Sequence, residues 1–252
     1  MVMRNISAIV PAFNEEKTVA GVVNKLLSSH LISEVICVND GSTDATAQIL
    51  SAFGDKIKFL NFADNHGKGF ALAQGILAAS GDIVAFFDAD IHNLSDRYIN
   101  LLISPVRNDQ NLTGALGVGC RYKSSLYFPW IVYLTGMRAY QKRKLIPYTD
   151  NMLDKRYGIE VYLNSLFDKN EIAIVPLFGL SCAAKYSKRA LIQAIKEYWQ
   201  TGFEVAKQKG EIELSQYINY KDLFNKLAPL ADVDTVKIRI KDIATKDIKD
   251  LF

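Results

Sequence analysis

The first half of the chain alternates short runs of strand-forming residues with helical stretches, and this alternation limits the fold more than any other feature. Runs rich in β-branched and aromatic residues predict four strands, at residues 6–10, 34–38, 57–61 and 82–87. Between them, apolar residues recur with helical spacing at 19–27, 47–53 and 69–79. The repeated order predicts an α/β fold with a mainly parallel sheet, right-handed crossovers and helices on both faces.

The second half follows a looser pattern. Residues 112–119 predict a fifth strand, although glycine is unfavourable inside strands. Beyond about residue 121 the alternation stops, and the pattern predicts helices at 135–145, 158–167 and 187–199 and a strand at 172–176. Residues 201–252 are more charged and are interpreted as an accessory segment after a main domain of residues 1–200.

Composition excludes several classes of protein. The chain has 252 residues, and its formal net charge of +3 is too small for a general nucleic-acid binder. Cys37, Cys120 and Cys182 are odd in number and lack CxxC spacing, so neither a disulfide framework nor a zinc site is indicated. The apolar run at 126–134 is about half the length of a membrane-spanning helix. We expect a cytoplasmic protein, with peripheral contact at the inner face of the membrane left open.

Polar residues follow each of the four predicted strands. In an open α/β sheet, ligands bind beyond the carboxyl ends of the strands, so these segments are expected to meet at one edge. In chain order they are Pro11-Ala12-Phe13-Asn14-Glu15-Glu16, Asn39-Asp40-Gly41-Ser42-Thr43-Asp44, Asn65-His66-Gly67-Lys68-Gly69 and Asp88-Ala89-Asp90.

Two of these segments also have structural interpretations, and a third resembles a known kind of binding turn. Residues 14–16 and 42–44 are typical of helix starts, where side chains cap the helix and acids suit its positive end. Residues 67–69 resemble an anion-binding turn, with backbone N–H groups and one lysine available for phosphate. This turn is not a Walker A sequence.

Asp88 and Asp90 indicate a metal site more specifically. Two carboxylates after a buried strand can hold Mg²⁺ or Mn²⁺ that also bridges two phosphates. The preceding Phe86-Phe87 provides an apolar wall against which an acid pair is costly without a cation. Asp232-Val233-Asp234 has the same spacing but follows no buried strand, so we expect no function there.

Together, residues 9–16, 38–44 and 87–90 resemble the family 2 glycosyltransferases of the GT-A fold, a Rossmann-like nucleotide-diphospho-sugar transferase fold. The strong resemblance covers about residues 4–92 and implies that residues 1–120 bind a UDP- or GDP-sugar. It implies that Lys68 contacts the donor and that Asp88 lies nearer the ribose and Asp90 nearer the metal. The nucleotide-sugar-binding set implied by the resemblance is Pro11, Ala12, Phe13, Asn14, Glu15, Asn39, Asp40, Lys68, Asp88 and Ala89.

A weaker resemblance covers residues 134–140 and 157–161. These are similar to acceptor-side loops in the branch that contains polyprenyl-phosphate sugar transferases and glucosyl-3-phosphoglycerate synthases. The resemblance implies an acceptor half at residues 121–200, with Gly136 and Arg138 as acceptor contacts. Arg138, with basic residues at 142–144, is interpreted either as a phosphate-binding site or as a solvated helix face.

The expected catalytic residues are Asp88, Asp90 and Glu160. A divalent ion at Asp90, together with Lys68, would stabilise the charge on the leaving diphosphate. A hydroxyl acceptor also needs a carboxylate base. In the family that the chain resembles, a Glu-Asp pair often provides this base; the chain has no Glu-Asp dipeptide, so Glu160 is nominated as the substitute. A phosphate acceptor is already ionised and needs none, which favours a phosphorylated acceptor.

The sequence thus predicts metal-dependent sugar transfer to a small-molecule or lipid-linked acceptor. The alternatives are a non-catalytic nucleotide-sugar-binding protein and a transferase acting on a glycan hydroxyl. A homodimer, and the choice between inversion and retention, stay open.

Overall fold

The computed structural model describes residues 4–120, 135–155 and 158–181, all within one compact unit that spans Met1–Ala184. The helix predicted at 187–199, the accessory segment at 201–252 and the aspartates at 232 and 234 lie outside the described residues. In the described part, no helix combines the length and the apolar character required to cross a membrane.

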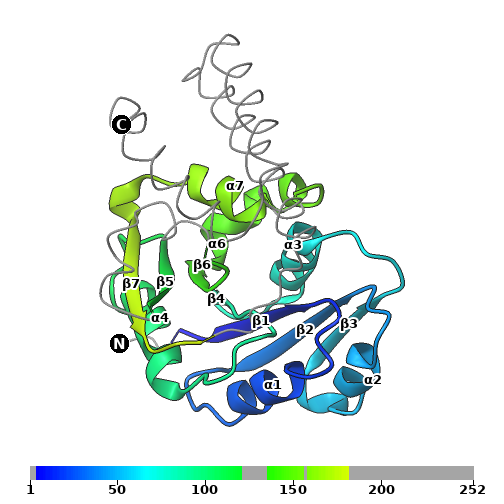
Figure 1. Cartoon of the computed structure of the whole chain (residues 1–252). Coiled ribbons are helices and arrows are strands. Elements are labelled where there is room, and N and C mark those ends of the chain that lie inside the picture. Colours follow the sequence, from blue (N-terminus) through cyan, green and yellow to red (C-terminus); the bar gives the residue numbers. More distant parts are fainter. Residues whose placement is uncertain (1–3, 121–134, 156–157, 182–252) are drawn as a thin grey trace, which may run out of the picture. The chain divides into compact units, whose positions relative to one another are not determined.

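The described unit is built on one seven-stranded sheet (Figure 1), with the order β3-β2-β1-β4-β6-β5-β7. Parallel pairing joins β1 to β2 and β4, β2 to β3, and β5 to β7, whereas β6 is antiparallel to both β4 and β5. The strands are β1 (Ile6–Ala12), β2 (Glu34–Asp40), β3 (Lys58–Phe62), β4 (Ile83–Phe86), β5 (Gly114–Cys120), β6 (Arg138–Gln141) and β7 (Ile172–Phe178).

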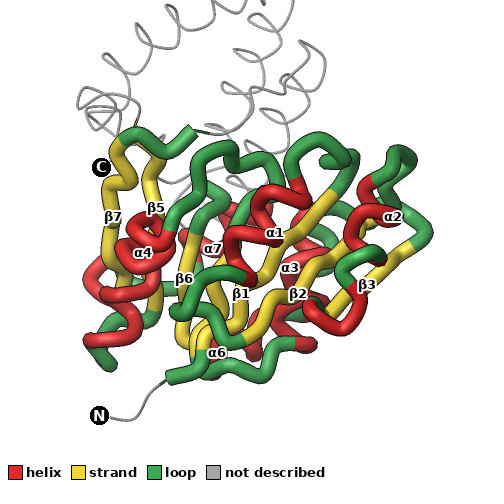
Figure 2. Tube along the Cα trace, turned by 90° about the horizontal axis from the view of Figure 1, so that it is seen from below, coloured by secondary structure: helices red, strands yellow, loops and turns green. Residues whose placement is uncertain are grey.

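Helices cover both faces of the sheet (Figure 2). The α-helices are α1 (Val19–Leu27), α2 (Thr46–Ser51), α3 (Lys68–Ala78), α4 (Asp96–Asn108), α6 (Lys142–Leu145) and α7 (Ile159–Ser165). The 3₁₀ turns are η1 (Gly54–Lys56), η3 (Ile146–Tyr148), η4 (Asp150–Met152) and η5 (Lys169–Glu171). One hydrophobic cluster contains residues of α1, α2 and α4, and the other contains residues of α3, α6 and α7.

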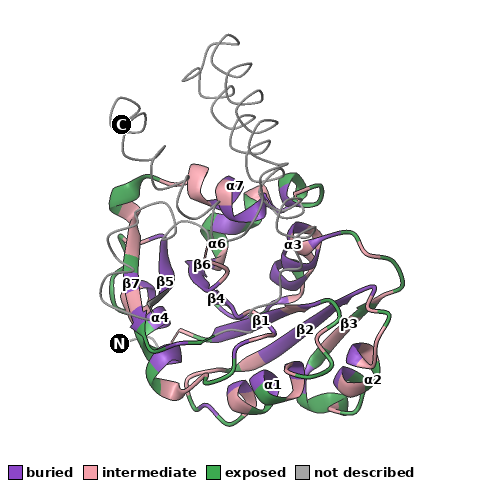
Figure 3. Ribbon diagram, in the orientation of Figure 1, coloured by how far each residue is buried: buried purple, intermediate pink, exposed green. Residues whose placement is uncertain are grey.

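Alternation along the strands explains the two clusters. In β1, Ala8 and Val10 belong to the first cluster, whereas Ile9 belongs to the second. Successive side chains of a strand point to opposite faces, so a central strand must be apolar on both. Most of the buried residues therefore lie along the middle strands and the inner sides of the helices (Figure 3).

The predicted fold class is confirmed, and the predicted strands in the first half lie within two residues of those observed. The helix predicted at 135–145 is wrong in its first part, because residues Arg138–Gln141 form β6 and the α6 helix begins at Lys142. All four residues of β6 are buried, since the strand lies between β4 and β5. A four-residue strand buried on both faces shows too little alternation to be distinguished from a helix. The sequence analysis also missed α4 (Asp96–Asn108).

Candidate active site

The segments after the first four strands are joined to one another at the carboxyl ends of those strands, as predicted. Hydrogen bonds join the loop after β1 to the loop after β2, and the end of β2 to the loop after β3. Lys68, which follows the third strand, donates to Asp88, which follows the fourth. This is the edge at which an open α/β sheet binds ligands.

The loop after β1 is fixed by the loop after β2. Asn14 has a φ of 57°, a left-handed conformation that asparagine tolerates better than most residues. Its Oδ1 accepts from the backbone N–H of Thr43 at 2.8 Å, and its own N–H donates to Ser42 Oγ at 3.0 Å. Glu16 accepts in the same way from the N–H of Ala45 at 3.1 Å. These side chains hold two loops together.

The predicted capping roles are only partly correct. The N-cap residues of α1 and α2 are Thr18 and Ala45, and neither makes a side-chain capping hydrogen bond. Asp44 comes nearest to the predicted role, since its Oδ1 accepts from the N–H of Thr46 at 2.9 Å. Asn14, Glu16, Ser42 and Thr43 contact the neighbouring loop. Glu15 instead contacts the start of its own helix, since its carboxylate accepts from the hydroxyl of Thr18 at 2.9 Å.

Asp40 occupies the turn that was predicted to bind an anion. Its two carboxylate oxygens accept from the N–H of His66 at 2.9 Å and from that of Gly67 at 2.7 Å. The N–H of Gly69 donates to the carbonyl of Lys155 at 3.0 Å. The interpretation of these N–H groups as free phosphate ligands is therefore wrong, because a carboxylate of the chain itself already binds this turn.

Other members of the predicted nucleotide-sugar-binding set differ in exposure. Asn39 is 2% exposed, and its Nδ2 donates to Asn61 Oδ1 at 2.8 Å. Ala12 and Ala89 are buried, and Pro11 is half-buried. Phe13, in contrast, is 43% exposed at the same edge of the sheet.

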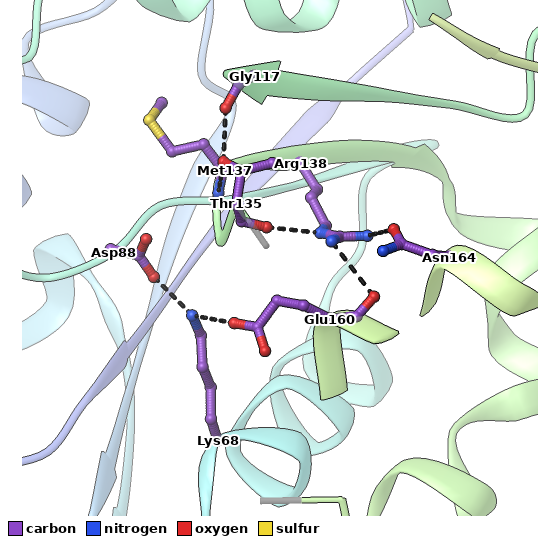
Figure 4. A network of polar contacts seen from close by, with 8 residues as sticks. All are labelled: Lys68, Asp88, Gly117, Thr135, Met137, Arg138, Glu160 and Asn164. Carbon is purple, nitrogen blue, oxygen red and sulfur yellow. Dashed lines mark hydrogen bonds and ion pairs between the residues drawn. The ribbon is translucent and has the colours of Figure 1, made fainter. Parts of the chain in front are cut away.

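Lys68, the first residue of α3, lies between two carboxylates (Figure 4). Its Nζ donates to Asp88 Oδ1 at 2.8 Å and to Glu160 Oε1 at 2.9 Å. Burial on its own would lower the pKa of Lys68, but the charges of Asp88 and Glu160 raise it well above its usual value. Lys68 therefore stays protonated at neutral pH, with 26% of its side chain accessible.

Asp90, unlike Lys68, lies near a charge of its own sign. Partial burial and the nearby charge of Asp88 raise the pKa of Asp90 from 3.8 to about 6. Asp90, unlike Asp88, is thus short of positive charge, and the carboxylate oxygens of both aspartates are the hard donors that Mg²⁺ and Mn²⁺ prefer. Within the described ranges, no three or more His, Cys, Asp and Glu side chains group into a metal site. A metal here would need oxygen ligands from the bound molecule as well as from the two acids.

Gly136 contacts this cluster through its backbone. A Cβ built on Gly136 would lie 2.3 Å from Asp88 Oδ2 and 2.6 Å from Lys68 Nζ. No larger residue fits without displacing the ion pair. The structure therefore places Gly136, predicted as an acceptor contact, directly against the predicted donor and metal residues.

Arg138 lies in the protein interior, a position that does not suit the acceptor contact predicted for it. It is 1% exposed, and its guanidinium donates to the Thr135 carbonyl and to Asn164 Oδ1, each at 2.8 Å. This position gives no support to a contact between Arg138 and an acceptor phosphate. The neighbouring Arg143 and Lys144 are exposed, as expected of a solvated helix face.

The sequence analysis missed the partners of Arg138. Asn164 is a half-buried residue of α7, and Thr135 precedes β6. Asparagine inside a helix is unfavourable unless its side chain has a partner, and this was the available signal for Asn164. No comparable signal marked Thr135.

Comparison with known proteins gives relatives that match less than half of the chain. A 4,4'-diaponeurosporenoate glycosyltransferase of Staphylococcus aureus is 32% identical over 118 residues, which are 46% of this chain and 30% of that protein. A glucosyl-3-phosphoglycerate synthase of Mycolicibacterium smegmatis is 36% identical over 110 residues, which are 41% of this chain and 36% of that protein. The chain therefore matches only about a third of the length of these relatives.

Solved structures match over more of the chain. Glucosyl-3-phosphoglycerate synthase of Mycobacterium tuberculosis, in complex with Mn²⁺, UDP-glucose and glycerol 3-phosphate, has a TM-score of 0.65 at 24% identity and covers 80% of each chain. Mannosyl-3-phosphoglycerate synthase of Rubrobacter xylanophilus has a TM-score of 0.68 at 18% identity and covers 83% of this chain and 76% of its own. These similarities show the shared GT-A fold.

The family model described as glycosyl transferase family 2 matches residues 7–169, which include every strand of the sheet except the last. Its span contains both aspartates of the metal candidate, Lys68, Gly136 and Glu160. The chain belongs to glycosyl transferase family 2.

Proposed function

We propose that this chain is a divalent-metal-dependent glycosyltransferase that takes its sugar from a UDP- or GDP-linked donor. The observation that carries the proposal is the cluster of Asp88, Asp90 and Lys68 at the carboxyl ends of parallel strands. Two acids and one charged lysine there suit a metal-bound diphosphate, which brings both negative oxygens and a cation. Family membership supports the reaction class.

In this proposal, Asp90 and Asp88 hold the metal and Lys68 contacts the diphosphate. A bound Mg²⁺ or Mn²⁺ would neutralise the negative charge that develops on the leaving diphosphate. Lys68 adds a positive charge at a fixed position, and its two carboxylate partners keep it protonated. The side chain of Lys68 is partly accessible, so a phosphate oxygen can reach it.

The nucleoside is assigned to the edge formed by the loops after β1 and β2. Phe13 supplies an exposed ring there, and residues 14 and 15 belong to a loop that the β2 side holds in place. Asp40 is 3% exposed and both its oxygens are bonded to the turn before Lys68. We therefore assign Asp40 an indirect role, in which it fixes the turn that carries Lys68.

The acceptor is proposed to be a small phosphorylated molecule. Support comes from the matched relatives, one of which is named glucosyl-3-phosphoglycerate synthase. A lipid-linked acceptor is the alternative, because another relative, named 4,4'-diaponeurosporenoate glycosyltransferase, has no phosphate in the acceptor of its name. Transfer to phosphoglyceric acid, compared with unphosphorylated glyceric acid, tests the phosphate requirement. Equal transfer to both, or to neither, would contradict a phosphorylated acceptor of this type.

A second candidate is transfer to a hydroxyl of a glycan. It is favoured by Glu160, whose carboxylate lies 2.9 Å from Lys68 Nζ in the same cluster as Asp88. A base for a hydroxyl would have to be within hydrogen-bonding distance of the acceptor. Glu160→Gln should then abolish transfer to a hydroxyl acceptor, a loss much larger than any effect it has on donor binding through Lys68.

The proposal is tested by thermal shift with a panel of UDP- and GDP-sugars, with and without Mn²⁺. A ligand that binds the folded state raises the melting temperature, so one donor should stabilise the protein in the presence of Mn²⁺. Asp90→Ala should abolish the metal-dependent shift. Asp234→Ala is the matched control, because it changes the same position of the other Asp-x-Asp sequence in the chain.

Two outcomes would contradict the proposal. The metal assignment fails if Asp90→Ala shifts as the parent does, and the donor assignment fails if no nucleotide sugar shifts the parent. Slow metal-dependent release of nucleoside diphosphate from the stabilising donor separates an enzyme from a protein that only binds nucleotide sugars.

A further inference from the structure

Arg138 lies in the middle of the sheet. It is the first residue of β6, paired opposite Phe86 of β4 and Leu116 of β5, and is 1% exposed. The next residue on the same face, Tyr140, belongs to the hydrophobic cluster under α3 and α7. A guanidinium placed in such surroundings is costly unless oxygen atoms accept from it, so its presence needs a reason.

Arg138 donates to oxygens on two walls of the site, the 135–137 turn and α7 (Figure 4). Its Nη1 also donates to the hydroxyl of Tyr140, on the same strand, at 3.1 Å. Nε donates to the carbonyl of Thr135 at 2.8 Å, in the turn that contains Gly136. The terminal nitrogens donate to α7, at Asn164 Oδ1 (2.8 Å) and at the carbonyl of Glu160 (3.3 Å). One planar side chain thus fastens the 135–137 turn to the helix that carries Glu160.

Both walls meet at Lys68. The Glu160 carboxylate is 2.9 Å from Lys68 Nζ, and the backbone of Gly136 leaves no space for a Cβ beside Lys68 Nζ and Asp88. A small movement of the turn or of α7 would therefore change the distance between Lys68 and its carboxylate partners. A displacement of about 1 Å in a site of this kind is enough to reduce function strongly.

We propose that Arg138 is a positioning residue: it holds the Gly136 turn and Glu160 at the separation that fixes Lys68 beside Asp88. This inference rests on the proposed function, in which Lys68 contacts the donor diphosphate. It replaces the predicted contact between Arg138 and acceptor phosphate with a role exerted through Lys68.

The experiment measures the Kd of UDP in the presence of Mn²⁺ by calorimetry, with GDP as the second probe. Arg138→Met should weaken binding about tenfold. Arg138→Lys should weaken it nearly as much, because an ammonium keeps the charge but cannot span two walls. Arg143→Met is the matched control, since Arg143 is an exposed arginine of α6, and it should leave the Kd unchanged.

A double-variant comparison separates positioning from general stability. In a Lys68→Met background, Arg138→Met should change the Kd less than about twofold, because the residue it acts through is gone. A purely structural Arg138 would weaken binding by the same factor in both backgrounds, and that result would overturn the proposal. Equal binding by the parent and Arg138→Met would overturn it too.

Asn164→Ala keeps the test decisive if Arg138→Met does not fold. It removes one acceptor from the α7 side and should weaken binding about threefold in the parent but not in the Lys68→Met background. An unchanged Kd in the parent background would count against the proposal. Failure of the parent itself to bind UDP or GDP with Mn²⁺ would instead contradict the proposed function.

Discussion

At the amino end of the parallel strands Glu34 lies against Ser7 and the 80–81 turn, whereas at the carboxyl end Asp90 lies beside Asp88. Glu34 Oε1 accepts from the hydroxyls of Ser7 and Ser80 and from the N–H groups of Ser80 and Gly81. Burial alone would raise the pKa of Glu34, but these hydrogen bonds outweigh it and lower the pKa. For Asp90, burial and the charge of Asp88 together raise the pKa to about 6.

The contrast separates a carboxylate that the chain itself stabilises, Glu34, from one that a bound cation would stabilise, Asp90. A carboxylate surrounded by donors stabilises the loops that supply them and is satisfied by the chain itself. A carboxylate with a raised pKa costs free energy until a cation arrives, and such groups concentrate at functional sites. Substitutions at the carboxyl end should therefore change ligand binding, and those at the amino end should change stability alone.

The largest effect is expected for Gly136→Ala. The added Cβ would lie 2.3 Å from Asp88 Oδ2 and 2.6 Å from Lys68 Nζ, so both side chains must move from their present positions. We expect affinity for a nucleoside diphosphate with Mn²⁺ to fall about a hundredfold. Gly21→Ala is the control, because its Cβ would have nothing within 4 Å. Unchanged binding by Gly136→Ala would show that the carboxyl end tolerates displacement and would weaken the contrast.

A smaller effect is expected for Asp40→Asn. An amide can accept from only one of the two N–H groups at 66 and 67 and presents its NH₂ to the other. We expect the free energy of unfolding to fall by about 2 kcal/mol, and donor affinity to fall with it. Urea denaturation and thermal shift measure the two effects.

Asp64→Asn controls for this change, because it makes the same substitution at an exposed position of the same loop. A loss of stability at Asp40 without a loss of donor affinity would place Asp40 with Glu34, as a purely structural carboxylate.

Asp90→Asn should be more stable than the parent in metal-free buffer at pH 7.5, by about 1 kcal/mol after allowance for partial exposure. The carboxyl of Asp90 has a pKa of about 6 in the folded protein against 3.8 ordinarily, so the folded state binds the proton more readily. The parent therefore loses stability as the pH rises from about 4 to about 6, and the variant does not.

Urea denaturation across this pH range measures the difference, which should vanish near pH 4. Addition of Mn²⁺ and the nucleoside diphosphate should reverse the order, because only the parent gains from binding. A parent that matches the variant at every pH would show that Asp90 is satisfied without a ligand.

Sequence patterns predicted the first half of this molecule better than the second half. Runs of β-branched and aromatic residues mark the strands predicted at 6–10, 34–38 and 82–87, and each run is followed by the segment that contains the polar residues. The contact between Asp40 and Gly67 spans 27 positions, and the contacts of Arg138 with α7 span 22 and 26. Pairings at such separations leave no local periodicity, so the positions of Asp40 and Arg138 could not be derived from their neighbours.

Burial on both faces explains why the residues of β6 were predicted as part of a helix. β6 contains Arg138 and Gln141 yet is buried throughout, because other parts of the chain accept from their side chains. When its partners are unknown, a polar residue predicts a solvent-exposed position even if it lies in a buried strand. The site residues themselves stay predictions, which the substitutions at 136, 40 and 90 address.

The smallest effect is expected for Glu34→Gln, at the amino end. The glutamine keeps an acceptor oxygen but loses the charge that strengthens the hydrogen bonds from residues 7, 80 and 81. Because Glu34 is partly accessible, the loss at pH 7 should be about 0.5 kcal/mol. The lowered pKa means that this contribution is present at neutral pH and disappears on acidification, so the parent and variant should converge below the folded-state pKa.

Donor affinity of Glu34→Gln should equal that of the parent, since Glu34 lies at the opposite end of the strands from the Lys68 cluster. Urea denaturation at pH 7 and at acid pH, together with calorimetry using UDP and Mn²⁺, measures both properties on the same preparations. A loss of affinity as large as that of Asp40→Asn would mean that the two ends of the sheet are coupled, and the distinction between satisfied and ligand-requiring carboxylates would then need another physical basis.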